Sequence, residues 1–195
     1  MYRTLVLSLV AVFLATTTRA EIYRWDNGQI IPGTEGIAPG PGAQLDHREL
    51  EYAALSDLDL TGAQFASSNL AHAMLESSTL TGADLTNANL TDTYMYYATL
   101  TNANFTGAVV RGARLGGIAQ QQLYSTRSYQ ERDLREIVLA ECELMGWTFT
   151  YQDLTNAWLN DSKLNDADLT SANLTNVDLS YSTLTGATLD RKSVV

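Results

Sequence analysis

The sequence predicts an all-β solenoid, in which the chain turns a corner every five residues and winds into stacked square coils. Two observations predict this fold. An apolar residue recurs at every fifth position over most of the chain, and a small residue stands two positions before it. A period of five matches neither the 3.6-residue period of an α-helix nor the two-residue period of a single strand. Four five-residue sides make a closed coil, so residues 20 apart in the sequence should stack.

The apolar residue of each unit, here called the centre, occurs in two runs, from Leu45 to Leu115 and from Leu134 to Leu189. On an α-helix, residues five apart would be rotated by about 140° from one another and would form no stripe. In a square coil, one large and one small side chain from each side point inward and interlock with the next layer. Asp or Asn often precedes the centre and Thr often follows it, and these residues should face outward. One inner column should contain Leu45, Phe65, Leu85 and Phe105.

Residues 1–20 have the three parts of a secretory signal peptide: a basic start, an apolar core and a small-residue end. Cleavage is expected after Ala20, which predicts a secreted or cell-envelope location. An N-terminal membrane anchor is the alternative, although the apolar core of about ten residues is short for a bilayer span. Residues 21–44 hold all three prolines and form an irregular lead-in, which Tyr23 and Trp25 could pack onto the first coil.

The two runs are separated by residues 116–133, because the centres Leu115 and Leu134 are 19 positions apart, one short of a coil. This segment could be one distorted coil or an excursion from the solenoid. Residues 118–124 contain fair helix formers and no breaker, so a short helix is favoured there. The second run, residues 134–189, begins with bulky residues in small-residue positions, and Trp147 among them should distort its coil until about Leu154. Residues 190–195 form a short tail. The bulky residues are Arg132, Ile137, Trp147 and Gln152.

Residues 83–91 (ADLTNANLT) and 167–175 (ADLTSANLT) resemble the A(D/N)LxX signature of the pentapeptide-repeat family, and the chain resembles exported bacterial members. This resemblance implies a right-handed quadrilateral β-helix with a short helical or irregular interruption near residues 116–133. It also implies a protein without catalytic activity, as most members have no known activity. A subset of the family is similar to DNA in shape and charge and inhibits or protects DNA gyrase.

The charged residues suggest one candidate binding surface. The formal net charge is −10, and residues 51–110 include six acidic residues and no Lys or Arg. Five arginines then follow between positions 111 and 135 and could form an anion-binding band for a partner such as a wall polymer. Local salt bridges are the alternative explanation. The band, called the arginine band below, consists of Arg111, Arg114, Arg127, Arg132 and Arg135.

No pattern in the sequence indicates an enzyme, a cofactor or a metal site. The single cysteine, Cys142, occupies a small-residue position and is expected to be buried. Five aspartates recur at one position of the repeat, which indicates support of the turns rather than acid–base catalysis. They are Asp59, Asp84, Asp153, Asp168 and Asp178. Only two histidines exist, both in the first run, so neither a catalytic thiol pair nor a metal site is predicted.

We therefore expect an exported, non-enzymatic scaffold or binding protein of the cell envelope or exterior, with an unidentified protein or polymer partner. No nucleic acid is expected as a ligand. The alternative is an acidic, DNA-mimicking modulator of a topoisomerase such as DNA gyrase. No amphipathic helix covers the last coil, so two molecules could also meet end to end as a homodimer.

Overall fold

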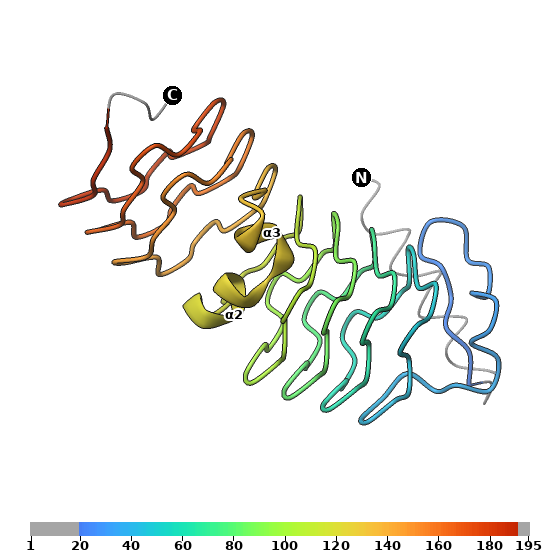
Figure 1. Cartoon of the computed structure of the whole chain (residues 1–195). Coiled ribbons are helices and arrows are strands. Elements are labelled where there is room, and N and C mark those ends of the chain that lie inside the picture. The colour runs from blue at the N-terminus through green and yellow to red at the C-terminus, as the bar shows by residue number, and fades with distance from the viewer. Residues whose placement is uncertain (1–19, 191–195) are drawn as a thin grey trace.

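The computed structural model describes residues 20–190 as a stack of square coils, drawn from blue to red in Figure 1. Parallel β-bridges join residues that lie 20 apart, as the five-residue period predicts. One side of the first run carries the series Asp59, Thr79 and Thr99, and another carries Asn69, Asn89 and Val109. The predicted β-helix of stacked 20-residue coils is thus confirmed.

Most corners are tight turns closed by the same backbone hydrogen bond. The N–H three residues after a centre donates to the carbonyl oxygen of that centre, as from Ala53 to Leu50 at 3.0 Å. The third residue of the turn has a positive φ, for example 56° at Asn87 and 66° at Gly112. Gly, Asn and Asp adopt this left-handed conformation most easily, which explains their frequency at the corners. At Gly112 a Cβ would also collide with the Asp92 carboxylate, which would have to turn away to make room.

The interior of the tube holds the centres and the small residues, as expected. The column of Leu45, Phe65, Leu85 and Phe105 is at most 1% exposed. Between these large side chains lie alanines such as Ala88, which is fully buried. Large and small residues therefore interlock between layers, and this close packing stabilises the stack.

The lead-in caps the N-terminal end of the solenoid. Ile22 and Ile31 are buried, and an antiparallel bridge joins Arg24 to Ala53. The indole Nε1–H of Trp25 donates to the carbonyl oxygen of His72 at 2.7 Å, which ties the lead-in to the second coil. The lead-in thus covers the apolar end of the tube at its N-terminal side.

The interruption is a longer coil that contains two short helices, α2 (Gln120–Ser125) and α3 (Arg127–Gln130). Figure 1 shows both helices between the two sets of regular coils. The bridge from Arg114 leads to Val138, whereas a regular coil would place its partner at position 134. The favoured helix over residues 118–124 is therefore present but begins at Gln120, and a second helix follows it. The interruption is therefore a distorted coil that contains helices, because the chain returns to pair with the preceding coil after α3.

The second run becomes regular earlier than the sequence suggests. Bridges with the regular spacing resume with Asp133 and Asp153, and the backbone around Trp147 bonds as in other coils. The expected distortion up to Leu154 is wrong, because the larger side chains pack against the helical insertion. Trp147 lies edge-on to Tyr124 of α2, with ring centroids 6.2 Å apart. The Gln152 side-chain amide donates to the carbonyl oxygen of Tyr129.

The last coil is less covered than the others. Leu179 and Leu184 are partly buried, and Leu189 is 45% exposed. The expected signal peptide falls almost entirely on residues 1–19, which lie outside the described residues, as do residues 191–195 of the tail.

Candidate functional site

The outward faces of the solenoid carry regular rows of polar side chains. The Asp59 carboxylate accepts hydrogen bonds from the backbone N–H of Thr61 at 3.0 Å and from its hydroxyl at 2.6 Å. Asn residues at the same position make the same bonds, and Asn89 also donates to the side chain of Asn69 in the neighbouring coil. The Asp/Asn and Thr rows therefore hold the corners and stack between coils.

These hydrogen bonds stabilise the charged form of the carboxylates. Thr61 lowers the pKa of Asp59, Thr170 lowers the pKa of Asp168, and Ser180 lowers the pKa of Asp178, in each case mainly through side-chain hydrogen bonds. A general acid needs a raised pKa, so these aspartates are unsuited to that role. Within residues 20–190, no group of three or more His, Cys, Asp or Glu side chains could hold a metal ion.

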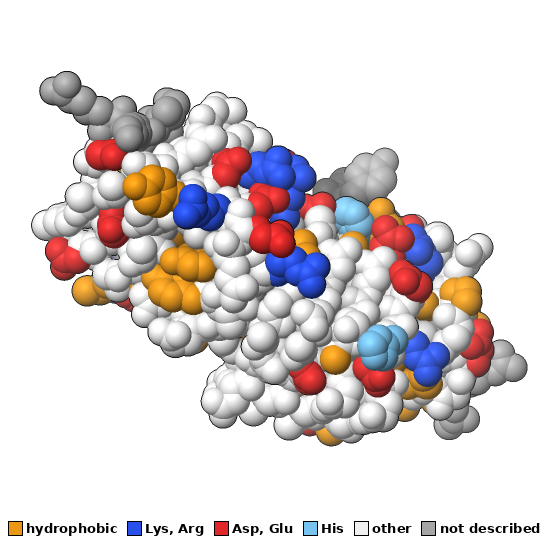
Figure 2. Space-filling view, viewed as in Figure 1, with side chains coloured by type: hydrophobic (Ala, Val, Ile, Leu, Met, Phe, Trp, Pro, Cys, Tyr) orange, Lys and Arg blue, Asp and Glu red, His pale blue; other side chains and the backbone are white. Residues whose placement is uncertain are grey.

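Two members of the arginine band are paired with carboxylates. The Arg111 guanidinium donates to Glu136 at 3.0 Å, one coil onward on the same face. Arg135 donates to both carboxylate oxygens of Asp133, at 2.7 and 2.8 Å, and this pairing lowers the pKa of Asp133. Blue and red side chains are accordingly intermixed in the middle of the face that Figure 2 shows.

The other three arginines have no carboxylate partner among the described residues. The Arg114 guanidinium lies 4.2 Å from the ring centroid of Tyr94, and that of Arg132 lies 5.2 Å from the ring of Tyr151. Arg127, at the start of α3, is exposed. These three cations are the part of the band that remains available to an anion.

An aromatic cluster near the N-terminal end was not identified from the sequence. Tyr52 and His72 stack with ring centroids 4.8 Å apart, and Trp25 lies beside Tyr52 at 5.7 Å. The Arg24 guanidinium lies 4.4 Å from the Tyr52 ring. The sequence signals are Trp25, which is expected to pack the lead-in onto the first coil, and the spacing of Tyr52 and His72 by one full coil, which places both at one corner column. Because all four side chains are at least partly buried by one another, the cluster fastens the lead-in.

Cys142 is buried, as predicted, with 6% of its surface exposed. Burial raises the pKa of its thiol, which disfavours the thiolate. This thiol therefore lacks the properties of a nucleophile.

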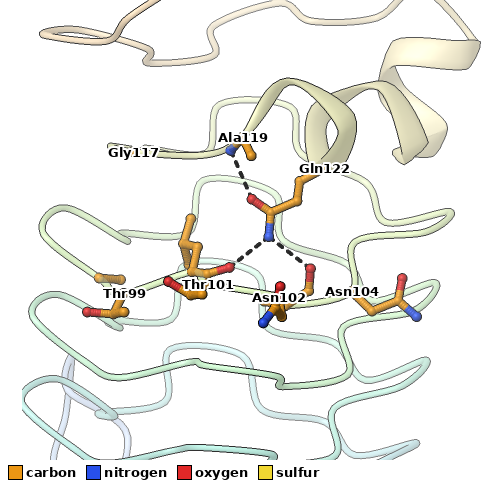
Figure 3. Close-up of a pocket in the computed structure, with 10 residues that line it drawn as sticks. Thr99, Thr101, Asn102, Asn104, Gly117, Ala119 and Gln122 are labelled. Atoms are coloured by element: carbon orange, nitrogen blue, oxygen red, sulfur yellow. Dashed lines mark hydrogen bonds between the residues drawn. The ribbon is translucent and has the colours of Figure 1, made fainter.

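A groove of about 760 Å³ opens where the chain leaves the regular coil for α2. Figure 3 shows Thr99, Thr101, Asn102 and Asn104 along one wall and Gln122 of α2 above them. The Gln122 amide donates to the carbonyl oxygens of Leu100 at 2.7 Å and Ala103 at 2.9 Å. The sequence did not predict this groove, because its position depends on the path of the insertion. Its lining contains no charged side chain.

None of the helices in the described part of the chain has the length and apolar character needed to cross a membrane.

Comparison with known proteins agrees with the architecture. The family model for pentapeptide repeats matches in eight copies, over residues 43–82, 83–118 and 153–191. No curated protein is detectably similar to the chain.

Three of the similar solved structures are pentapeptide-repeat or drug-resistance proteins. HetL of the cyanobacterium Nostoc, which is involved in the regulation of heterocyst differentiation, is 23% identical, with 74% of this chain and 73% of HetL covered and a TM-score of 0.40. A thylakoid-lumen pentapeptide-repeat protein of Arabidopsis thaliana is 20% identical, with 65% and 68% covered and a TM-score of 0.31. QnrB1, a plasmid-mediated fluoroquinolone resistance protein, is 20% identical, with 70% and 64% covered and a TM-score of 0.31. These likenesses concern the fold alone.

Proposed function

Since the chain belongs to the pentapeptide-repeat family, we propose that it is a binding scaffold of the cell envelope or exterior, without enzymatic activity. Proteins of this family are in general structural or binding proteins. The observation that carries the proposal is the regular outer surface: polar side chains recur once per coil on a backbone ladder that holds them rigidly. A rigid surface loses little conformational entropy on binding, which favours recognition of an extended partner.

The proposed location depends on the N-terminal sequence, which has the features of a secretory signal. The test is to express the full chain in a bacterium, fractionate the cells and measure the mass of the product. Export predicts a periplasmic or extracellular protein that begins at Glu21. A full-length product that stays in the cytoplasm would contradict the proposal.

For the partner, we propose an anionic envelope polymer that contacts the arginine band. Arg127 and Arg132 are exposed, and neither has a carboxylate partner within the described range, so a polyanion would not have to displace an ion pair there. Arg111 and Arg135 are already neutralised by Glu136 and Asp133 and should contribute less.

The test is a binding titration with a purified anionic wall polymer. The double variant Arg127→Gln/Arg132→Gln should bind about three- to tenfold more weakly, with a reduced salt dependence. The control Lys163→Gln removes an exposed cation that pairs with Glu143 outside the band, and it should bind normally. Equal affinities for all three proteins would contradict a role of the band.

A DNA-mimicking modulator of a topoisomerase is the second candidate. It is favoured by the first run of coils, where residues 51–110 carry six acidic side chains and no basic one. A gyrase supercoiling assay with the purified protein tests it. Inhibition or protection at micromolar protein would support this function, and no effect would exclude it.

We also propose that two copies can meet at their C-terminal coils. Leu184 is only partly buried and Leu189 is 45% exposed, and open β-helix ends pair readily with other chains. Light scattering should give the mass of a dimer, and Leu189→Glu should reduce it to that of a monomer. The control Tyr181→Glu changes a side chain that is 89% exposed at a corner and should leave the dimer intact. A monomeric wild-type protein would contradict the proposal.

A further inference from the structure

Along the groove, the strand segment around Leu100 has backbone groups that make no hydrogen bond to a following coil. In the regular coil, the N–H groups of Leu80 and Gly82 donate to the carbonyl oxygens of Thr99 and Thr101, at 2.8 and 2.9 Å. The corresponding N–H groups of the next rung belong to Leu100 and Asn102. Neither of them has an acceptor among residues 20–190, and the carbonyl oxygen of Ala98 has no donor there. The edge therefore presents two donors and one acceptor in the register of a parallel strand.

The helical insertion causes this opening. A regular coil would place residues 119–121 as the next rung over Leu100. Instead, the chain turns away into α2, and the N–H of Ala119 donates to the side chain of Gln122 at 2.9 Å. Gln122 fastens the helix to the rim of the groove through the carbonyl oxygens of Leu100 and Ala103 (Figure 3), and the N–H groups of Leu100 and Asn102 keep no acceptor among residues 20–190. As a result, Thr99 is exposed, whereas Thr79 one rung earlier is half-buried.

We propose that this groove binds an extended segment of a different protein, which adds the missing rung as a short parallel strand. Unpaired strand edges are templates for this kind of addition, since main-chain hydrogen bonds supply the affinity. The incoming strand would accept from the N–H groups of Leu100 and Asn102 and donate to the carbonyl oxygen of Ala98. A segment of about three residues, roughly 10 Å long, spans these positions.

The surroundings define the chemistry of that segment. The core of the interrupted coil is already filled by Ile118 and Leu123, which are 6% and 0% exposed. The inward residue of the incoming strand must therefore be small, such as Gly, Ala or Ser. The neighbouring outward residues are threonines, at 79 and 99, and the lining is uncharged, which favours short polar side chains over charged ones.

This inference makes the proposed binding function more specific at a surface other than the arginine band. The two can fail separately, because a polymer can bind the band whether or not a peptide enters the groove.

The test is amide hydrogen exchange, followed by NMR, with the peptide acetyl-Ser-Thr-Ala-Thr-Gly-amide as the probe. Its sequence is that of residues 78–82 with Ala in place of the central leucine. Without the peptide, the amides of Leu100 and Asn102 should exchange faster than those of Leu80 and Gly82, which are already bonded. At a peptide concentration about ten times its Kd, exchange at Leu100 and Asn102 should slow by about tenfold, because only the unbound fraction exchanges.

Two controls separate strand addition from unspecific binding. N-methylation of the first threonine of the peptide removes the donor to Ala98 and should abolish the protection. The variant Ala119→Arg places a long side chain at the mouth of the groove and should also abolish it. The variant Gln121→Arg makes the same charge change on α2 away from the lining, and it should bind the peptide normally.

No protection of Leu100 and Asn102 at millimolar peptide would overturn the proposal. The same holds if the N-methylated peptide protects equally well. Protection by a neutral oligosaccharide instead of the peptide would identify a glycan site and would also contradict strand addition. If these amides were protected in the free protein in a concentration-dependent manner, the occupant would be a second copy of this chain, again against the proposal.

Discussion

Replacing Leu85 by alanine tests the packing of the tube at its best-defined position. Leu85 is fully buried and lies in the inner column between Phe65 and Phe105, which are 0% and 1% exposed. Packed layers on both sides prevent the backbone from collapsing into the cavity, because each rung is fixed by hydrogen bonds to its neighbours. Leu→Ala substitutions at such sites cost about 2–5 kcal/mol, and the rigid surroundings favour a value of about 3–4 kcal/mol.

The assay is urea unfolding followed by circular dichroism. With a slope of about 2 kcal/mol per M, a loss of about 3 kcal/mol lowers the midpoint by about 1.5 M. The control Thr86→Ser changes an outward neighbour and keeps the hydroxyl that donates to Asp84, so its midpoint should move by less than about 0.3 M. If the control were more destabilised than Leu85→Ala, the assignment of inside and outside would be refuted.

Four further outcomes follow from the structure. Ala88→Leu should lower stability by about 1–3 kcal/mol in the same assay, because the small position has no space for a larger side chain; an unchanged midpoint would contradict close packing. Trp147→Ala should cost about 3–5 kcal/mol and speed hydrogen exchange in α2 and α3, since Trp147 packs on Tyr124; unaltered exchange in the helices would contradict this. Cys142 should react with a thiol reagent only at the rate of unfolding, and fast labelling of the native protein would disagree with its burial. Asp59 should titrate below its ordinary pKa in an NMR titration, and Thr61→Val should raise the pKa of Asp59. Because folding lowers the pKa of Asp59, the carboxylate stabilises the fold at pH values above its unfolded-state pKa. This stabilisation is lost as the pH falls through the folded-state pKa.

The repetitive part of the fold could be predicted because each unit contains the information for its own turn. The centre, the small residue and the Asx–Thr pair recur within five positions, so local hydrogen bonds and inward packing can be inferred without knowing distant contacts. The positive φ at the corners was not identified from the sequence, although Gly, Asn and Asp at that position carry the signal.

The insertion could be predicted only in part, because its form depends on contacts between distant residues. Helix formers indicated a helix, but the greater length of the coil follows from the pairing of Arg114 with Val138. The bulky Trp147 and Gln152 occupy small-residue positions, and the sequence predicts that Trp147 distorts its coil. They are better understood as partners of a covering element, since both contact residues of the insertion.

The candidate binding surfaces could be predicted only where they depend on residues close in the sequence. The arginine band is visible in the sequence, and the pairing of Arg135 with Asp133, two residues before it, is local enough to foresee. The pairing of Arg111 with Glu136 joins neighbouring coils across the insertion and requires the length of the inserted coil. The groove depends on which backbone groups the insertion leaves unpaired, and this cannot be inferred from residue types.

Disulfide trapping tests the 20-residue coil most directly. Thr79 and Thr99 are joined by a parallel bridge, so their Cα atoms lie at the spacing of adjacent strands, about 4.8 Å, which a disulfide can span. In a Cys142→Ser background, the pair Thr79→Cys/Thr99→Cys should oxidise readily to an intramolecular disulfide. The pair Thr79→Cys/Asn89→Cys is closer in sequence but lies on opposite sides of the tube, and it should stay reduced. Efficient oxidation of the second pair and none of the first would contradict the stacked square coil.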